Sequence, residues 1–420
     1  MYAPLITGIF GKTLHMIDRK ILQLDNIGGV ILFSHNFTSR DQIKKLIDDI
    51  QAIRVKNKLP KALILIDHEG GVVQRLNSCE FTSLPSAAQI GQIYQKNPDK
   101  ARLIINSCAK ITAYELNDIG INVCLAPVLD LLKTNTKEDR SRFFSDQPDV
   151  IFSLAAEYIS VLQNHGILAV AKHFPGIGSS KTNTHYSTSI SESELDELIR
   201  NDLAPYIQLQ NHGLLLALMT AHRVYHKIDQ QPVSTSSKWM RDILRDKLHY
   251  QGLAFTDCIQ MGGANIMGTN LESKIFNSLK AGCDFILSSQ TPFGYYTEMY
   301  RIVMSKTIDE YISSNTSRKE RVSQVFNLIT DLKKSRPLSN SDYLSARDYL
   351  KNMNKLFINH RVQTNSNSNS LPILYRFKMS IYRNKRLKKY IKKKRLFHLI
   401  SFYSFRMRMM IVKIKYYFTK

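Results

Sequence analysis

The stretch ILAVAKHF, residues 167–174, is an apolar run that ends on the polar pair Lys172 and His173. Segments with helical periodicity alternate with such runs, as at 39–57, 99–120 and 149–166. Seven more short runs rich in apolar and β-branched residues lie at 5–11, 28–34, 62–67, 121–128, 214–221, 252–258 and 281–289. Eight strands alternating with helices predict an α/β fold, a single (β/α)8 TIM barrel. A doubly wound open sheet is the alternative, because periodicity cannot show whether a sheet closes.

Polar side chains stand at the ends of several of these runs. Asp67 ends the third run, Lys172 and His173 end the fifth, His222 follows the sixth and Asp257 ends the seventh. In a (β/α)8 barrel the carboxyl ends of the strands share one rim, which is where active sites are built. The sequence therefore predicts a functional site on that rim.

Asp257, in the segment AFTDCIQMGG, is the first candidate for chemistry. A carboxylate at a strand end can act as a nucleophile that forms a covalent intermediate with a sugar. The alternative is a helix N-cap, a common role of Asp where a strand leads into a helix.

Asp67 and Arg75, in the segment LIDHEGGVVQRL, form a second candidate. The carboxylate can accept hydrogen bonds from the hydroxyl groups of a ligand, and the guanidinium can donate them. The alternative pairs Asp67 with Glu69 as a turn and a cap, with Arg75 reaching to solvent.

Three further polar residues carry weaker signals. Arg142, in RSRFFSDQPDV, is a single arginine of the kind that usually has no specific role. Lys172 and His173 fit either contacts to a ligand or an ion-pair network on the rim.

His185 follows the loop PGIGSSKTNT, residues 175–184, in which Ile177 is the only large apolar residue. Loops of this kind on a barrel rim often close over substrates. A histidine, with an unperturbed pKa near ~6.5, can donate a proton there and later take it back. Metal binding by His173, His185 and His222 is the alternative, but no spacing such as H-x-x-x-H supports it. The sequence predicts neither a metal nor a cofactor.

The composition indicates a cytoplasmic protein. The start, MYAPLITGIFGKTLHM, lacks the basic and apolar regions of a signal peptide, and no run of about 18 apolar residues predicts a spanning helix. No C-x-x-C pair occurs, so neither a zinc site nor a disulfide framework is indicated. The cysteines are odd in number and scattered, at Cys79, Cys108, Cys124, Cys258 and Cys283.

The formal charge of +23 is unevenly distributed along the chain. Residues 371–420 contain 16 of the 58 Lys and Arg residues and no Asp or Glu, which leaves about +7 for residues 1–370. The pattern predicts a domain at 1–350, a polar low-complexity linker at 351–370 and a basic, aromatic and poorly ordered tail at 371–420. The tail could contact an anionic membrane, grip RNA, or remain a solvated extension. No specific nucleic-acid partner is expected.

Four segments together resemble glycoside hydrolase family 3, in particular its NagZ-type β-N-acetylglucosaminidases. The family segment D-x-E-G-G-x-x-x-R matches residues 67–75, and R-x-F/Y before D-P loosely matches RFFSDQP. The segment K-H-F-P-G-H-G followed by D-S-H matches residues 172–185 at identical length, and S-D-x-x-x-M matches TDCIQM. The resemblance covers residues from about 5 to 340.

The resemblance implies a retaining exo-enzyme that removes terminal N-acetylglucosamine, typically from cytoplasmic muropeptides during cell-wall recycling. Asp257 would be the nucleophile and His185 the general acid/base. The expected binding partner is a small carbohydrate, an N-acetylglucosaminyl muropeptide. The contacts to the sugar would be Asp67, Arg75, Arg142, Lys172 and His173.

Three positions depart from the family pattern: Ile177 replaces a histidine, Thr184 a serine, and Asn183 the aspartate that should pair with His185. Asparagine accepts a hydrogen bond but carries no charge. In a serine-protease triad the analogous change costs about 10⁴ in rate. Two alternatives to a hydrolase therefore stand: a catalytically impaired sugar-binding barrel, or a glycoside phosphorylase, since a histidine does not repel phosphate.

Overall fold

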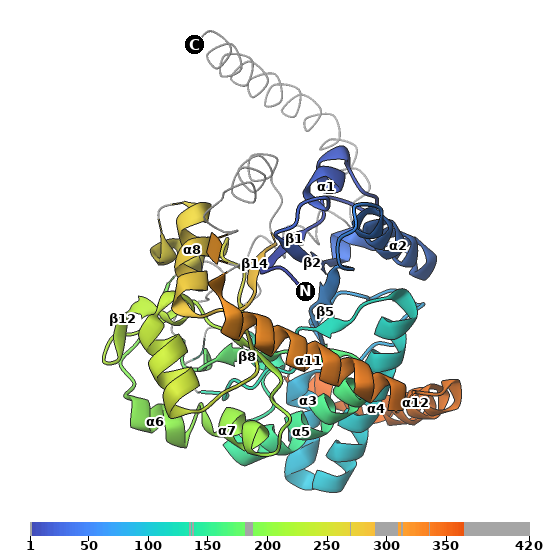
Figure 1. The fold of residues 1–420 in the computed structure, drawn as a ribbon. Coiled ribbons are helices and arrows are strands. Elements are labelled where there is room, and N and C mark those ends of the chain that lie inside the picture. The colour runs from blue at the N-terminus through green and yellow to red at the C-terminus, as the bar shows by residue number, and fades with distance from the viewer. Residues whose placement is uncertain are drawn as a thin grey trace, which may run out of the picture. The chain divides into compact units, whose positions relative to one another are not determined.

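All eight apolar runs form strands in the computed structural model of the protein, and helices lie between them as predicted (Figure 1). The structure describes residues 2–133, 136, 138–180, 188–268, 270–289, 310, 311, 314–335 and 337–364, the stretch 354–364 as backbone only. The strands at the eight positions are short and parallel. They are β1 (Leu5–Gly8), β2 (Ile27–Leu32), β3 (Leu63–Ile66), β6 (Val123–Cys124), β7 (Leu168–Ala169) with β8 (Ala171–Phe174), β10 (Ala217–Thr220), β13 (Leu253–Thr256) and β14 (Ile286–Ser288).

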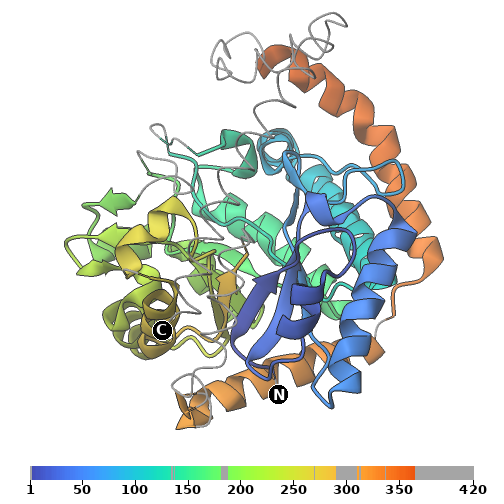
Figure 2. The same ribbon diagram turned by 90° about the horizontal axis from the view of Figure 1, so that it is seen from above.

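The helices surround these strands (Figure 2). They are α1 (Met16–Ile21), α2 (Arg40–Lys56), α3 (Ala87–Lys96), α4 (Pro98–Ile119), α5 (Pro148–Asn164), α6 (Leu195–Arg200), α7 (Ala204–Asn211), the π-helix η4 (Lys238–Lys247), α8 (Leu271–Ala281), α11 (Thr316–Ser335) and α12 (Asn340–Thr364). Short pieces fill the connections: β4 (His68–Gly70), β5 (Val73–Gln74), β9 (Ser189–Ser191), β11 (Arg223–Tyr225), β12 (Asp229–Pro232) and the 3₁₀ turns η1 (Ser34–Asn36), η2 (Arg140–Arg142), η3 (Val233–Thr235) and η5 (Gly262–Met267).

The prediction of a single closed (β/α)8 barrel is wrong. Within the described part of the chain the strands divide into a six-stranded parallel sheet, β14-β1-β2-β3-β6-β7, and a separate three-stranded parallel sheet, β13-β10-β8. Two isolated bridges, Val128–Lys172 and Phe255–Phe285, pair residues across the division. Beside the first bridge the register shifts by one residue, because the N–H of Val170 donates to the carbonyl of Cys124 and the N–H of Lys172 to that of Pro127. The fold is α/β with a parallel main sheet and several small sheets.

The strands are apolar on both faces because each face is covered. One cluster of buried side chains fills the space between strands and helices, and a second cluster, which includes Ile31, Leu125 and Leu287, lies between the strands themselves. Helix α11 contributes Val322, Val325 and Ile329 to the second cluster, and its Arg318 donates hydrogen bonds to the carbonyls of Tyr2 and Asp284. Because those carbonyls precede β1 and β14, α11 covers the amino-terminal end of the strands and leaves the carboxyl end open.

By its contacts the chain divides at Phe357, into Met1–Phe357 and Ile358–Lys420. Helix α12 runs through residues 351–364 of the predicted linker, whereas residues 365–420, including the predicted tail, lie outside the described residues. The domain boundaries at 350 and 370 and the role of the tail therefore stay predictions. None of the helices in the described ranges is long and apolar enough to span a bilayer.

Candidate active site

A cavity of about 610 Å³ lies at the carboxyl ends of the strands. Its floor includes the apolar side chains of Ile31, Leu125, Met219 and Leu287. Six of the eight site residues predicted from the sequence line this cavity: Asp67, Arg75, Arg142, Lys172, His173 and Asp257. The structure thus brings together residues that are up to 190 positions apart in the chain.

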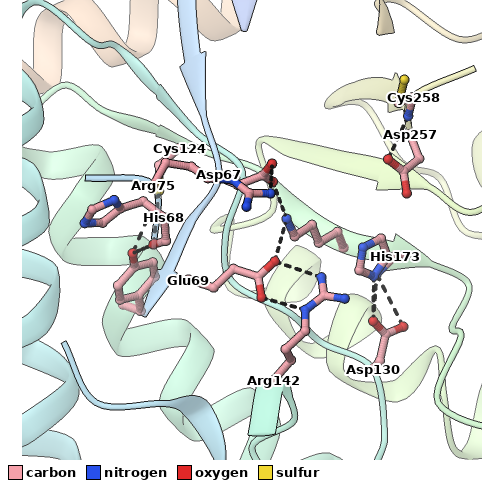
Figure 3. A network of polar contacts seen from close by, with 12 residues as sticks. Asp67, His68, Glu69, Arg75, Cys124, Asp130, Arg142, His173, Asp257 and Cys258 are labelled. Atoms are coloured by element: carbon pink, nitrogen blue, oxygen red, sulfur yellow. Dashed lines mark hydrogen bonds and ion pairs between the residues drawn. The ribbon is translucent and has the colours of Figure 1, made fainter. Parts of the chain in front are cut away.

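Asp67 lies directly after β3 and meets two cations (Figure 3). The Lys172 ammonium donates to Asp67 Oδ1 at 2.8 Å, and the Arg75 guanidinium donates to Oδ2 at 3.2 Å. Lys172 is buried, with its side chain 3% exposed, whereas Arg75 is partly accessible. Because each cation has further N–H groups, Lys172 and Arg75 can donate hydrogen bonds to a polar ligand in the cavity while they remain paired with Asp67.

Glu69 is a member of the site that we predicted only as half of a turn and cap pair. Its two oxygens accept from Arg142 Nε and Nη2 at 2.9 and 2.8 Å, and Lys172 Nζ lies 2.8 Å from Oε1 (Figure 3). The bidentate geometry fixes the plane of the Arg142 guanidinium. Glu69 stands in the D-x-E-G-G segment, so the signal that could have identified it was present in the sequence.

The ion pairs keep this network fully charged at neutral pH. Burial alone would raise the pKa of Glu69, but Lys172 and Arg142 outweigh burial and lower the pKa to about 2. In the same way Lys172 and Arg75 hold the pKa of Asp67 well below its usual range despite burial. Burial would lower the pKa of Lys172, and the two carboxylates raise it instead. Three cations thus face two anions beside the cavity.

His173 is backed by a buried carboxylate that the sequence analysis did not identify. Its Nδ1 lies 2.7 Å from Oδ2 of Asp130, a side chain with no exposed surface (Figure 3). Asp130 lies two residues beyond the fourth apolar run, so the sequence placed it near the same end of the strands. Its position therefore carried the same kind of signal as Asp67 and Asp257.

Asp257 follows β13 and is partly exposed on the cavity wall. Its backbone N–H donates to the carbonyl of Thr220, and its Oδ1 accepts from the N–H of Cys258 at 2.7 Å. His222 supports this turn from behind, since its ring nitrogens contact the Cys258 carbonyl at 3.1 Å and the Ser234 hydroxyl at 2.8 Å. Burial lowers the pKa of His222, so its imidazole is neutral and structural.

His185 and Asn183 lie outside the described residues, in the segment 181–187. The residues on both sides of that segment are described, and the buried hydroxyls of Ser180 and Ser189 are joined by a hydrogen bond of 2.7 Å. The roles given to His185 and Asn183 stay predictions. Within the described ranges no cluster of three His, Cys, Asp or Glu side chains could hold a metal ion.

Several known proteins are similar to this chain. Residues 11–327 match the family described as the glycosyl hydrolase family 3 N terminal domain. A β-hexosaminidase of Thioalkalivibrio sulfidiphilus is 36% identical over 289 residues, which are 69% of this chain and 81% of that protein. A β-hexosaminidase of Nitrosomonas eutropha is 37% identical over the same shares of both chains.

Solved structures show the same likeness. The crystal structure of NagZ from Neisseria gonorrhoeae in complex with N-trifluoroacetyl-D-glucosamine has a TM-score of 0.70 to this chain at 28% sequence identity. The match covers 83% of this chain and 97% of that one. That protein binds a sugar derivative.

Proposed function

The chain belongs to glycosyl hydrolase family 3, among the NagZ-type β-N-acetylglucosaminidases, and on that premise we propose that it hydrolyses terminal N-acetylglucosamine from muropeptides in the cytoplasm during peptidoglycan recycling. The observation that carries the proposal is the shared cavity. A strand-end carboxylate, Asp257, lines the same space as a fixed network of charged donors and acceptors. This combination suits a reaction in which the sugar is held by its hydroxyls while its anomeric carbon is attacked.

In the proposed reaction Asp257 attacks the anomeric carbon and forms a glycosyl-enzyme intermediate, as retaining glycosidases do. His185 protonates the leaving oxygen and then removes a proton from the attacking water. Asp67, Arg75, Arg142, Lys172 and His173 hold the terminal sugar. The ion pairs support this role because they fix Arg142 and Lys172 in place before a substrate arrives.

The test is release of p-nitrophenol from p-nitrophenyl N-acetyl-β-D-glucosaminide by the full chain. We expect turnover by the wild type, loss of turnover in Asp257→Ala, and unchanged turnover in Asp242→Ala, a control at an exposed carboxylate in η4. The anomer first released, observed by NMR, should retain the β configuration. No turnover by the wild type at high enzyme concentration would reject the proposal. Release of the sugar from purified muropeptides tests the natural substrate.

Asn183 favours a second candidate function, a sugar-binding protein with impaired catalysis, because it lacks the charge expected beside His185. Turnover by the wild type separates the two, because a slowed hydrolase cleaves the substrate, whereas a binding protein binds N-acetylglucosamine in calorimetry without turnover. Asn183→Asp should raise the rate of the hydrolase, and it restores turnover to the binding protein if only the missing charge impairs catalysis. A phosphorylase would instead release the sugar 1-phosphate in phosphate buffer.

A further inference from the structure

Asp130 is a buried carboxylate next to the cavity whose two oxygens both accept hydrogen bonds. Oδ1 accepts the backbone N–H of Ile177 at 2.8 Å, and Oδ2 lies 2.7 Å from Nδ1 of His173. The backbone N–H of His173 points between the two oxygens, 3.3 Å from each. Three N–H donors thus converge on one side chain that has no exposed surface.

These contacts determine the state of the His173 ring. An ionised carboxylate can only accept, so the proton shared with Asp130 must be carried by Nδ1. That leaves Nε2 as the ring nitrogen available to a ligand in the cavity, which His173 lines. The same carboxylate joins His173 in β8 to Ile177, three residues beyond that strand.

We propose that Asp130 is a positioning residue of this site, which fixes the tautomer and orientation of His173 so that Nε2 meets a hydroxyl of the terminal sugar. The inference rests on the proposed function, since it takes His173 to be a sugar contact. Asp130 itself touches no substrate, and it acts through the imidazole.

A carboxylate is required at this position because both oxygens are used. Asparagine has one carbonyl oxygen and one amide that donates, so in Asp130→Asn the amide would face an N–H group of either His173 or Ile177. Where the amide faces Ile177, that backbone N–H loses its acceptor. Where the amide faces Nδ1, it can donate to the ring only if the ring carries its proton on Nε2, which is the opposite tautomer.

The experiment measures binding of N-acetylglucosamine and hydrolysis of its p-nitrophenyl β-glycoside by full-chain variants. For Asp130→Asn we expect about tenfold weaker binding of the sugar, because the loss of about one hydrogen bond lowers affinity by roughly that factor. KM should rise by a similar factor while kcat changes little, because the lost contact acts on ground state and transition state alike. His173→Asn should give a similar loss.

The decisive comparison is the double variant. If Asp130 acts through His173, Asp130→Asn causes no further loss of affinity in the His173→Asn background. A matched control is Asp284→Asn, because Asp284 is equally buried and ion-paired, to Arg245 and Arg321, but stands before β14 at the other end of the strands. That variant should lower the melting temperature and leave sugar affinity unchanged.

Three results would each overturn the inference, even if wild-type turnover still supports the proposed function. They are additive losses of affinity in the double variant, an equal loss of affinity in Asp284→Asn, and unchanged affinity in Asp130→Asn. A wild type that neither binds nor cleaves the sugar would reject both. If Asp130→Asn does not fold, nitrogen NMR of the ¹⁵N-histidine-labelled wild type decides. A proton on Nδ1 of His173 is expected, and a ring protonated only on Nε2 overturns the inference.

Discussion

Glu69 is the residue on which the charged network depends. It stands between Lys172 and Arg142, and its side chain is only 5% exposed. A buried ion pair contributes little over apolar packing, but removing one partner leaves an uncompensated charge that is costly. The network is therefore sensitive to the loss of its acids.

The first prediction is that Glu69→Gln destabilises the protein by about 3 kcal/mol at pH 7, because two buried cations lose a shared carboxylate. Urea denaturation measures the change in the free energy of unfolding. Glu194→Gln, which removes the exposed partner of Lys227, should leave that free energy unchanged. Equal effects of the two substitutions would contradict the expected role of burial.

The second prediction concerns pH. The pKa of Glu69 falls from 4.5 to about 2 on folding, so between these values the unfolded chain binds more protons than the native one. Stability from this group is complete above about pH 4.5 and is lost as the pH falls toward 2, and it amounts to about 3 kcal/mol. The difference in unfolding free energy between wild type and Glu69→Gln should therefore narrow from pH 7 to pH 3. A difference that is constant with pH would argue against a depressed pKa.

At the scale of elements, the approach of helix α3 to the segment after η2 places Arg142. A Cβ atom built on Gly91 of α3 would lie 1.7 Å from the carbonyl oxygen of Phe144, which is two residues beyond Arg142. The carbonyl of the next residue, Ser145, accepts the N–H of Leu132 at 2.9 Å, so the segment is also held from its other side. A side chain at position 91 has no space unless this backbone moves.

The third prediction is that Gly91→Ala lowers the free energy of unfolding by about 1–3 kcal/mol, the usual cost of overpacking. It should also lower kcat/KM, because Arg142 shifts away from Glu69. Urea denaturation and the p-nitrophenyl assay measure the two effects. Gly11→Ala is the control, since the nearest atom to its built Cβ is 3.9 Å away. Loss of stability with unchanged kcat/KM would show that the helix contact does not position Arg142.

At the scale of the whole molecule, the candidate active site and most of the net positive charge lie in different parts of the chain. The predicted site residues that the structure describes all lie between Asp67 and Asp257, whereas residues 371–420 hold 16 basic residues and no acid. From the distribution of charge we propose a separate role for the tail, attraction to an anionic membrane surface.

The fourth prediction is that a chain truncated after Asn365 keeps kcat/KM within about twofold of the full chain, since a difference below ~0.5 kcal/mol is expected when no site residue is removed. The full chain should sediment with vesicles that contain phosphatidylglycerol, and less so as salt is raised. The truncated chain should remain in the supernatant. Equal sedimentation of both chains would refute membrane attachment through the tail.

Local patterns in the sequence were enough to place the strands and helices. Each of the eight apolar runs contains a strand, and the bounds of α2, α4 and α5 lie within two residues of the predicted segments 39–57, 99–120 and 149–166. These features are local, because periodicity, caps and apolar runs act within a few residues. The sequence also placed Asp67, Lys172, His173 and Asp257 at strand ends, which was enough to predict that they share one cavity.

The pairing of the strands and of the charged side chains, by contrast, is set only in the folded chain. The division of the ladder depends on backbone partners that no periodicity records. The one-residue shift in register between Cys124 and Pro127, opposite Val170 and Lys172, is an example. The pairing of Glu69 with Arg142, and of Asp130 with His173, joins residues 73 and 43 positions apart. Which carboxylate neutralises which cation depends on distance in space, and the chain fixes that distance only when it has folded.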